Sequence, residues 1–199
     1  MSRVRVRPTR DETRERLYAA AAEVFEEQGI GAASVEAIAA AAGFTRGAFY
    51  SNFASKDELI GAMLADHAEQ TVRRHLELLS RHREPADFVA ALRAMDRSEQ
   101  DPLGRSPLLH IELILYAARA AEGRGELAET LRARREMIAD ILRGTHLARG
   151  AAGLDIERLC AMLLALEDGF RLHRLVDPQA IPPDSFVRAV EDLQRALAP

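Results

Sequence analysis

Residues 34–59 hold the feature that most constrains this chain, because three helix signals follow one another there with only short breaks between them. Ser34 is a good N-cap for a first helix, and Gly43 suits its C-terminal end, since glycine adopts left-handed backbone angles without steric cost. Thr45 can cap a short second helix over residues 46–51, and a third helix starts soon after. A helix, a glycine-containing turn and a short helix together form the outline of a DNA-reading helix-turn-helix.

The run over residues 42–59, AGFTRGAFYSNFASKDEL, resembles the signature of the TetR family of transcriptional regulators. In that family the signature spans the recognition helix and the start of the fourth helix. The match is dense and has no gap, and a helix expected over residues 10–28 precedes it. One departure is Asn52, where the family more often has histidine, although an asparagine amide can still donate to a phosphate. Beyond the N-terminal part, the chain resembles the family only in its length and helical organisation.

Glycine and proline divide the rest of the chain into further helical segments, and the sequence shows no alternating strand pattern. We therefore predict an all-α fold of about nine helices. Residues 1–56 form a three-helix DNA-binding domain, and residues 57–199 form a larger helical domain. The TetR resemblance implies that the larger domain binds an effector and dimerises. The helices are expected over residues 10–28, 35–42, 46–51, 56–82, 87–95, 108–121, 126–143, 156–176 and 184–197.

The chain has a net charge of −4, yet residues 1–10 contain four arginines and no acid. Affinity for phosphate depends on local positive potential rather than on total charge, so the net charge does not exclude DNA binding. The basic arm over residues 1–9 either lies in a neighbouring minor groove or is a disordered tail that only adds solubility. Both interpretations stay open.

The single cysteine, Cys160, excludes an internal disulfide and fits a reducing cytoplasm. It lies in an apolar helical run, so we expect a buried structural thiol rather than a redox sensor. No signal peptide begins the sequence, and no run of about 18 apolar residues is present that could span a membrane. We therefore expect a cytoplasmic protein.

The second helix of the motif is expected to enter the major groove with its exposed face forward. That face consists of Thr45, Arg46, Gly47, Ala48 and Ser51. Arg46 is the best candidate for base readout, most plausibly through two hydrogen bonds to a guanine edge. Gly47 would allow the helix backbone to approach the DNA closely, and Ala48 could touch a thymine methyl group.

Four further residues are expected to hold phosphates, which orient the helix without carrying sequence information. They are Ser34, Tyr50, Asn52 and Lys56. Ser34 would act through its hydroxyl and the amides of the helix N-terminus. Two alternatives stay open: Tyr50 could be a core aromatic residue, and Lys56 could be a solvated residue at a helix start.

The last two expected helices carry apolar bands too wide for ordinary surface helices. The first band consists of Ile156, Leu159, Cys160, Leu163, Leu166, Phe170 and Leu172, and the second of Phe186, Val187, Val190, Leu193 and Leu197. Two such helices from each of two subunits would form a four-helix bundle at a two-fold axis, as the TetR resemblance also implies. The alternative is that the bands pack inside one subunit. A homodimer would read a palindrome through two recognition helices.

The resemblance also implies an effector cavity among the C-terminal helices. Its candidate lining consists of Phe88, Leu92, Met95, His110, Leu113, Tyr116, Met137, Ile141, Leu166 and Phe170. Each of these could instead be an ordinary core residue. Polar groups inside apolar runs are more informative, namely His110, Glu112, Tyr116 and Asp168, and a buried Glu112 would need a partner. They favour a mainly apolar ligand with one polar group.

These patterns predict a dimeric repressor that an unidentified small molecule releases from a palindromic DNA operator. An activator, a regulator without a ligand, and a C-terminal domain that docks another protein are the alternatives. The sequence predicts no enzyme, because it has neither a phosphate-binding glycine loop nor a nucleophile elbow. No cofactor or metal is expected, since His110, Glu112, His146 and His173 lack the spacing of metal ligands.

Overall fold

The computed structural model describes residues 8–81, 102–143 and 155–197, and within these ranges it contains nine helices and no strand. The predicted all-α fold is confirmed. The helices are α1 (Arg10–Gln28), α2 (Val35–Ala41), α3 (Arg46–Tyr50), α4 (Lys56–Arg81), α6 (Pro102–Arg105), α7 (Pro107–Arg119), α8 (Ala121–Arg143), α10 (Ile156–Val176) and α11 (Ser185–Leu197). The helix predicted over residues 87–95 and most of the basic arm lie outside the described residues.

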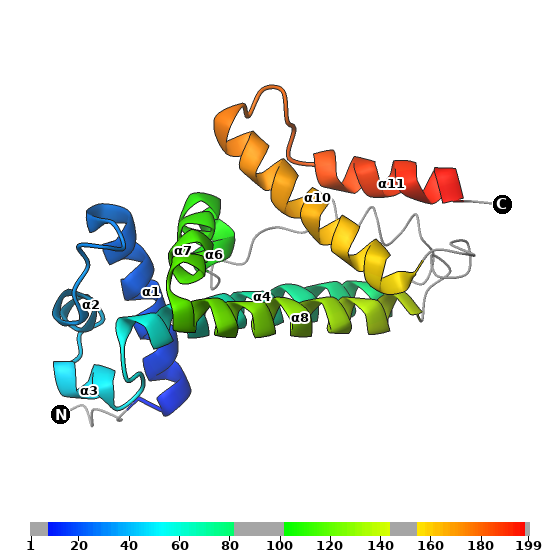
Figure 1. Cartoon of the computed structure of the whole chain (residues 1–199). Coiled ribbons are helices and arrows are strands. Elements are labelled where there is room, and N and C mark those ends of the chain that lie inside the picture. The colour runs from blue at the N-terminus through cyan, green and yellow to red at the C-terminus, as the bar shows by residue number, and fades with distance from the viewer. Residues whose placement is uncertain (1–7, 82–101, 144–154, 198–199) are drawn as a thin grey trace, which may run out of the picture.

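The helices form an elongated molecule with α1, α2 and α3 at one end (Figure 1). α4 leads away from that end alongside α8. α7 packs on α4 and α8, while α10 crosses α8 and also contacts α7. α11 packs against α10 at the far end from α3 (Figure 1). In the described part of the chain no helix is both long enough and apolar enough to cross a bilayer.

Local sequence signals set the limits of the first helices. The Thr9 hydroxyl accepts a hydrogen bond from the Glu12 amide at 3.2 Å, and the Glu12 carboxylate accepts one from the Thr9 amide at 2.7 Å. These two bonds form a capping box at the start of α1. Ser34 and Thr45 cap α2 and α3 through their side-chain oxygens. Gly43 has φ +73°, the left-handed backbone expected of a residue that ends a helix.

One apolar core holds the short helices together and continues into the larger half. The core includes Phe25 of α1, Ile38 of α2 and Phe49 of α3, each at most 1% exposed. Burying one such side chain contributes about 1.5–3 kcal/mol relative to leaving it exposed. The same cluster includes Ile60 of α4 and Leu113 of α7. The end formed by α1 to α3 carries the predicted DNA-reading motif, and we call it the DNA-reading end. It is packed directly on the helices of the larger half.

Two segments differ from the predictions. The helix break expected at residues 122–125 lies at Ala120, whose extended backbone (φ −79°, ψ 134°) separates α7 from α8. One extended residue is enough to turn the chain, and Gly125 does not interrupt α8, because a glycine inside a helix costs only about 1 kcal/mol relative to alanine. The short helix α6 was not predicted. Pro102 suits a first helical position, and Leu103 is 2% exposed, so burial stabilises this turn.

Candidate nucleic-acid interface and effector site

α3 is held by one face and presents the other to solvent. Phe49 is fully buried and lies 5.8 Å from the Phe53 ring and 5.5 Å from the Tyr50 ring, centroid to centroid. Tyr50 itself is 44% exposed, so the alternative of a core aromatic residue is wrong. On the face predicted to read DNA, the exposed residues are Thr45, Arg46, Gly47 and Ser51. Ala48, on the same face, is half-buried.

The Arg46 guanidinium is the most prominent cation on this face. Its Nη1 lies 2.7 Å from Glu36 Oε1 on α2, and its Cζ lies 5.4 Å from the centroid of the Tyr50 ring. The Tyr50 and Glu36 side chains raise the pKa of Arg46, so it stays charged at every relevant pH. Both members of the ion pair are more than half exposed, so solvent weakens it and a guanine edge can compete for the guanidinium. The sequence analysis missed Glu36, although its place in the first turn of α2 is visible.

The other polar side chains of the motif make local backbone hydrogen bonds. The Ser34 and Thr45 hydroxyls accept from Ala37 and Ala48 amides, each at 3.1 Å. Beyond α3, the Ser51 hydroxyl donates to the Gly47 carbonyl at 2.9 Å, and the Asn52 Nδ2 donates to the Ala48 carbonyl at 2.8 Å. These bonds define the ends of α2 and α3, and their predicted DNA contacts stay predictions.

Lys56 ties the loop between α1 and α2 to the start of α4. Its Nζ donates to the carbonyls of Ile30 at 2.6 Å and Ala33 at 3.0 Å. The same ammonium lies 5.8 Å from the Tyr116 ring of α7, and the Tyr116 hydroxyl donates to Asp57 Oδ1 at 3.1 Å. A freely solvated Lys56 is therefore wrong, while its phosphate contact stays untested. The first turn of α4 thus joins the DNA-reading end to α7.

Two arginines of α1 brace the motif from behind, and the sequence analysis did not identify them. Arg14 stacks 4.5 Å from the Phe53 ring and donates to the Tyr18 hydroxyl at 2.9 Å. Arg16 stacks 4.5 Å from the Phe44 ring and donates to the Ala42 carbonyl at 2.8 Å. Both guanidiniums therefore position α2 and α3 against α1.

The predicted effector residues differ in burial, and some of them lie outside the described residues. His110 and Leu113 are buried on α7, and Tyr116, Met137, Leu166 and Phe170 are half-buried. Phe88, Leu92 and Met95 lie outside the described residues, and the Ile141 side chain is likewise not described.

Two acidic residues singled out in the sequence, Glu112 and Asp168, are not buried. Glu112 is exposed, because α7 turns Leu109, His110 and Leu113 inward, so it does not need the partner that a buried Glu112 would require. Asp168 also keeps exposed surface. Partial desolvation nevertheless raises the pKa of its carboxyl, although Arg134 and Arg171 oppose the shift.

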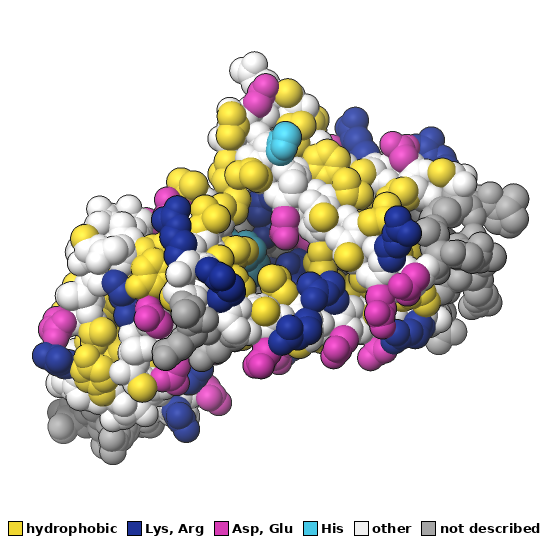
Figure 2. Space-filling view, in the orientation of Figure 1, with side chains coloured by type: hydrophobic (Ala, Val, Ile, Leu, Met, Phe, Trp, Pro, Cys, Tyr) yellow, Lys and Arg dark blue, Asp and Glu magenta, His cyan; other side chains and the backbone are white. Residues whose placement is uncertain are grey.

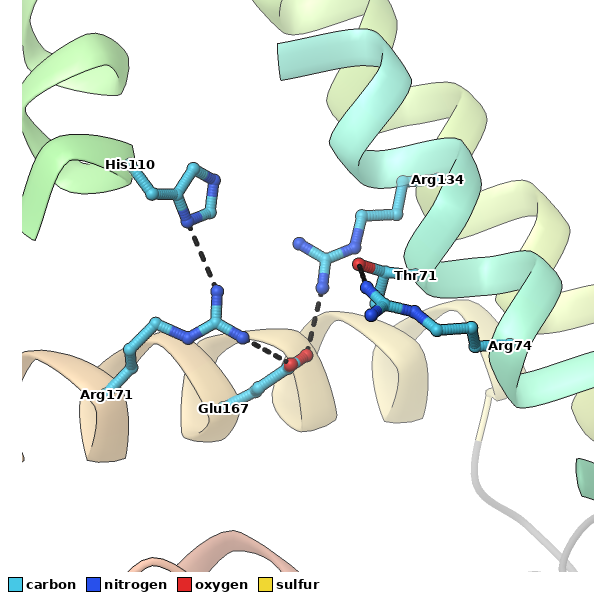
Figure 3. Close-up of polar contacts among 6 residues, drawn as sticks. All are labelled: Thr71, Arg74, His110, Arg134, Glu167 and Arg171. Atoms are coloured by element: carbon cyan, nitrogen blue, oxygen red, sulfur yellow. Dashed lines mark hydrogen bonds and ion pairs between the residues drawn. The ribbon is translucent and has the colours of Figure 1, made fainter. Parts of the chain in front are cut away.

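The most unusual part of the larger half is a set of polar side chains between four helices, which we call the internal polar cluster (Figure 3). It consists of Thr71 and Arg74 of α4, His110 of α7, Arg134 of α8, and Glu167 and Arg171 of α10. Buried charge is costly unless it is paired, so a cluster of this kind needs an explanation. The prediction identified only His110, because arginine on a helix is normally a surface residue.

One carboxylate lies at the centre of this cluster. Glu167 Oε2 lies 2.9 Å from Arg134 Nη2, and Glu167 Oε1 lies 2.9 Å from Arg171 Nη2. Arg171 Nη1 lies 3.2 Å from His110 Nδ1, whose ring centroid is 4.5 Å from that of His67. In the space-filling view, histidine and charged side chains lie in a recess where α7, α10 and the α4–α8 pair meet (Figure 2).

An exposed apolar seam runs along α10. Met162, Ala165, Gly169, Leu172 and Val176 recur at alternating spacings of three and four residues, and three of them are large exposed hydrophobic side chains. That spacing is typical of a helix that packs on another helix along its length. Part of the predicted band packs inside the subunit instead: Leu159 and Cys160 form a cluster with Ala139 and Leu142 of α8. The large side chains of the remaining seam stay exposed in the single chain.

Among the residues that the structure describes, no three or more histidine, cysteine or acidic side chains are grouped so that they could hold a metal ion. Of the weighed ligands, His146 lies outside the described residues and Glu112 is exposed. Burial raises the pKa of the Cys160 thiol and so favours its protonated form.

Comparison with known proteins identifies both halves of the chain. Residues 17–63 match the profile of bacterial regulatory proteins of the TetR family. Residues 105–199 match the profile of the C-terminal region of BetI-type transcriptional repressors. The first match includes the helix-turn-helix motif. The second includes α7, α8 and α10, which contribute most of the internal polar cluster.

Individual proteins show the same similarity. The chain is 30% identical over 198 residues to the HTH-type transcriptional regulator TtgR of Pseudomonas putida, covering 89% of this chain and 87% of that protein. It is 49% identical over 55 residues to the HTH-type transcriptional regulator SrpR of Pseudomonas putida, a match limited to 28% of this chain and 26% of SrpR. A crystal structure from Pseudomonas aeruginosa PAO1 superposes with a TM-score of 0.76, covering 96% of this chain and 92% of that chain at 22% identity, which shows the shared fold.

Proposed function

This chain belongs to the TetR family of DNA-binding transcriptional regulators, and we propose that it is a homodimeric repressor that a small effector releases from a palindromic operator. Members of this family are regulators and not enzymes. The observation that carries the proposal is the exposed face of α3, where Arg46 lies beside Gly47 above a fully buried Phe49. A short helix anchored from behind and open in front suits the major groove.

In the proposed complex, Arg46 exchanges Glu36 for the acceptors of a guanine edge. The exchange replaces one solvent-exposed ion pair by two hydrogen bonds in a desolvated interface. Gly47 adds no side chain between the α3 backbone and the DNA, and Ala48 would contact a thymine methyl group. Thr45 and Ser51 flank this contact from the two ends of α3.

Four residues around α3 are proposed to contact phosphates. Tyr50 offers an exposed hydroxyl, and the N-terminus of α2 beyond Ser34 offers backbone amides. Asn52 and Lys56 would need to add a phosphate to the backbone contacts that they already make. We place the domain boundary between Lys56 and Asp57. A regulator that binds chromosomal DNA would work in the cytoplasm.

The α10 seam is proposed to pair with its copy in a second subunit, together with α11. Val176 is 83% exposed in the single chain, and such a side chain on a continuous apolar stripe favours burial by a partner. Ala165 and Gly169 are small, so two α10 helices could approach closely at the centre of the seam. A two-fold axis at this position would give the two α3 helices the symmetry of a palindrome.

Release of the operator is proposed to follow a shift in population between two arrangements of the helices. An effector that binds better to the arrangement with low DNA affinity would favour that arrangement. α4 is the natural lever, because its first turn contacts the DNA-reading end while Thr71 and Arg74 lie in the internal polar cluster. An activator, a ligand-independent regulator, or a C-terminal half that docks another protein would use the same α3 without this shift.

The test is a titration of the purified protein into fluorescent DNA from upstream of its own gene, at several salt concentrations. We expect tight, salt-dependent binding to a palindrome, which scrambled DNA does not share. Arg46→Ala should lose about 1–3 kcal/mol for the correct base and little for a substituted base at that position. Arg73→Ala is the matched control, because Arg73 is an exposed arginine of α4 paired with Glu69. Sequence-blind binding by the unaltered protein would contradict the proposal.

A further inference from the structure

The internal polar cluster contains more positive than negative charge, because Arg74, Arg134 and Arg171 surround the one carboxylate among its members, that of Glu167. Arg134 and Arg171 both pair with the single carboxylate of Glu167. The Arg134 side chain is 6% exposed and that of Arg171 is 19% exposed, and guanidinium groups do not lose their proton in proteins. The other nearby acid, Asp168, keeps exposed surface, and Arg134 and Arg171 also act on its carboxyl electrostatically. Glu167 is the acid that forms ion pairs with both guanidiniums.

The donors of both arginines are also incompletely used. Arg134 Nε is buried and has no hydrogen-bond partner among the described residues. Arg171 Nη1 points at His110 Nδ1, and because arginine can only donate, this nitrogen must accept. An imidazole nitrogen is a weaker acceptor for a guanidinium than an anionic oxygen is, so Arg171 Nη1 can exchange this contact for one with an anion.

Apolar side chains adjoin the cluster on the same helices. Leu113 lies one turn after His110 on α7, Met137 one turn after Arg134 on α8, and Phe170 one turn after Glu167 on α10. Residues one turn apart lie on the same face of a helix. Leu113 is buried, and the other two are half-buried. A ligand in the recess of Figure 2 would therefore meet charged groups and an apolar wall together.

We propose that the effector of this regulator is an acidic amphiphile, whose carboxylate or phosphate binds between Arg171 and Arg134 and whose apolar body packs on the adjoining side chains. The inference rests on the proposed function, because it names the chemical class of the effector. The anion compensates the second guanidinium and takes the place of His110 as the partner of Arg171 Nη1. A cationic ligand should bind poorly, because it would bring a further positive charge to the arginines that already share the carboxylate of Glu167.

The first experiment compares probes that share one apolar body and differ only in the head group. The probes are decanoate, decyl phosphate, decanol and decylamine, with benzoate, phenyl phosphate, benzyl alcohol and benzylamine as an aromatic series. Thermal unfolding and titration calorimetry are measured on the full-length protein. We expect the acidic members of at least one series to raise the Tm and to bind at least about tenfold more tightly than the alcohol and amine. The tighter of carboxylate and phosphate then identifies the head group.

Variants test whether the cluster is responsible. Arg171→Gln should weaken acid binding by about tenfold or more, and Arg171→Lys should retain part of it. Arg73→Gln, at an exposed arginine, is the control and should change nothing. Glu167→Gln removes the competing carboxylate, so acidic probes should stabilise this variant more than the unaltered protein. A role of Glu167 in folding alone would not produce that gain.

Several results would overturn the inference: no binding by any acid, equal or tighter binding by the amine or alcohol, or unchanged acid binding in Arg171→Gln. The operator titration is run on the same protein preparation. If operator binding holds and the acids do not bind, the effector class is wrong while the regulator stands. If acids bind but no operator does, the proposed function fails and the anion site remains.

Discussion

The two ends of this molecule are stabilised in different ways. Around α1 to α3, aromatic and aliphatic side chains fill a continuous core, capped helix ends satisfy backbone groups, and charged groups lie at the surface. Between α4, α7, α8 and α10, arginines, a glutamate and histidines occupy the interior. The first arrangement favours one conformation. The second includes charges that a purely structural core would avoid, so it is suited to respond to something that binds there.

The comparison predicts its largest effect at Phe49, the residue that anchors α3. Phe49→Ala should lower the free energy of unfolding by about 3–5 kcal/mol, because it leaves a cavity where three helices meet. Urea unfolding followed by circular dichroism measures the change, and operator binding should be lost with it. Leu108→Ala is the control, since Leu108 is 55% exposed and its truncation should cost less than about 0.5 kcal/mol. A small effect at Phe49 would mean that α3 is held by other contacts.

The internal polar cluster should respond to substitution differently from an apolar core. Glu167→Gln should destabilise by roughly 3 kcal/mol, since it leaves two largely buried guanidiniums without their carboxylate. Removing all three charges together, with Arg134→Met, Glu167→Leu and Arg171→Met, should be neutral or stabilising in the absence of ligand. Thermal unfolding of the unaltered protein and both variants measures the two effects. If the triple variant is less stable than Glu167→Gln, the charges are an essential part of the fold and the contrast between the two ends disappears.

Gly43 tests the local backbone of the DNA-reading end. Its φ of +73° and the Arg16 Nη2 atom 3.2 Å from where a Cβ would lie both oppose a side chain there. Gly43→Ala should cost about 1–2 kcal/mol, close to the penalty of a left-handed alanine plus a shift of the arginine. Chemical denaturation of the variant and its controls gives the value.

Two other glycines separate the causes of that loss. Gly29 has φ +78° and ψ 151°, a region that only glycine occupies readily, and no atom lies within 4 Å of an added Cβ, so Gly29→Ala should lose stability through the backbone alone. Gly31 has neither constraint, and Gly31→Ala should change stability little. A loss at Gly43 no larger than the loss at Gly31 would show that neither the left-handed backbone nor the Arg16 contact opposes a side chain at Gly43.

The same contrast explains what the sequence could predict. The caps at Ser34 and Thr45 and the turn at Gly43 act over a few residues, so their signals were visible and their predicted positions are confirmed. The pairing of Arg134 with Glu167 joins α8 to α10 across 33 residues, and only tertiary packing creates it. The contacts of Arg14 and Arg16 were not predicted for the same reason, because they join residues far apart in the sequence. Helical periodicity alone also could not tell which side of α10 packs inward and which forms the seam.

The smallest expected effect concerns Cys160, which lies in a small apolar cluster between α8 and α10. Cys160 is fully buried beside Ala139 and Leu142, and burial raises the pKa of its thiol above the ordinary value of 9.0. Because the folded state favours the protonated thiol, this contribution to stability is complete below the unfolded pKa and declines as the pH rises above it. Iodoacetamide at pH 8 should therefore label the native protein slowly and the urea-unfolded protein quickly, as mass spectrometry would show. Equally fast labelling in both states would mean that the α8–α10 contact opens readily.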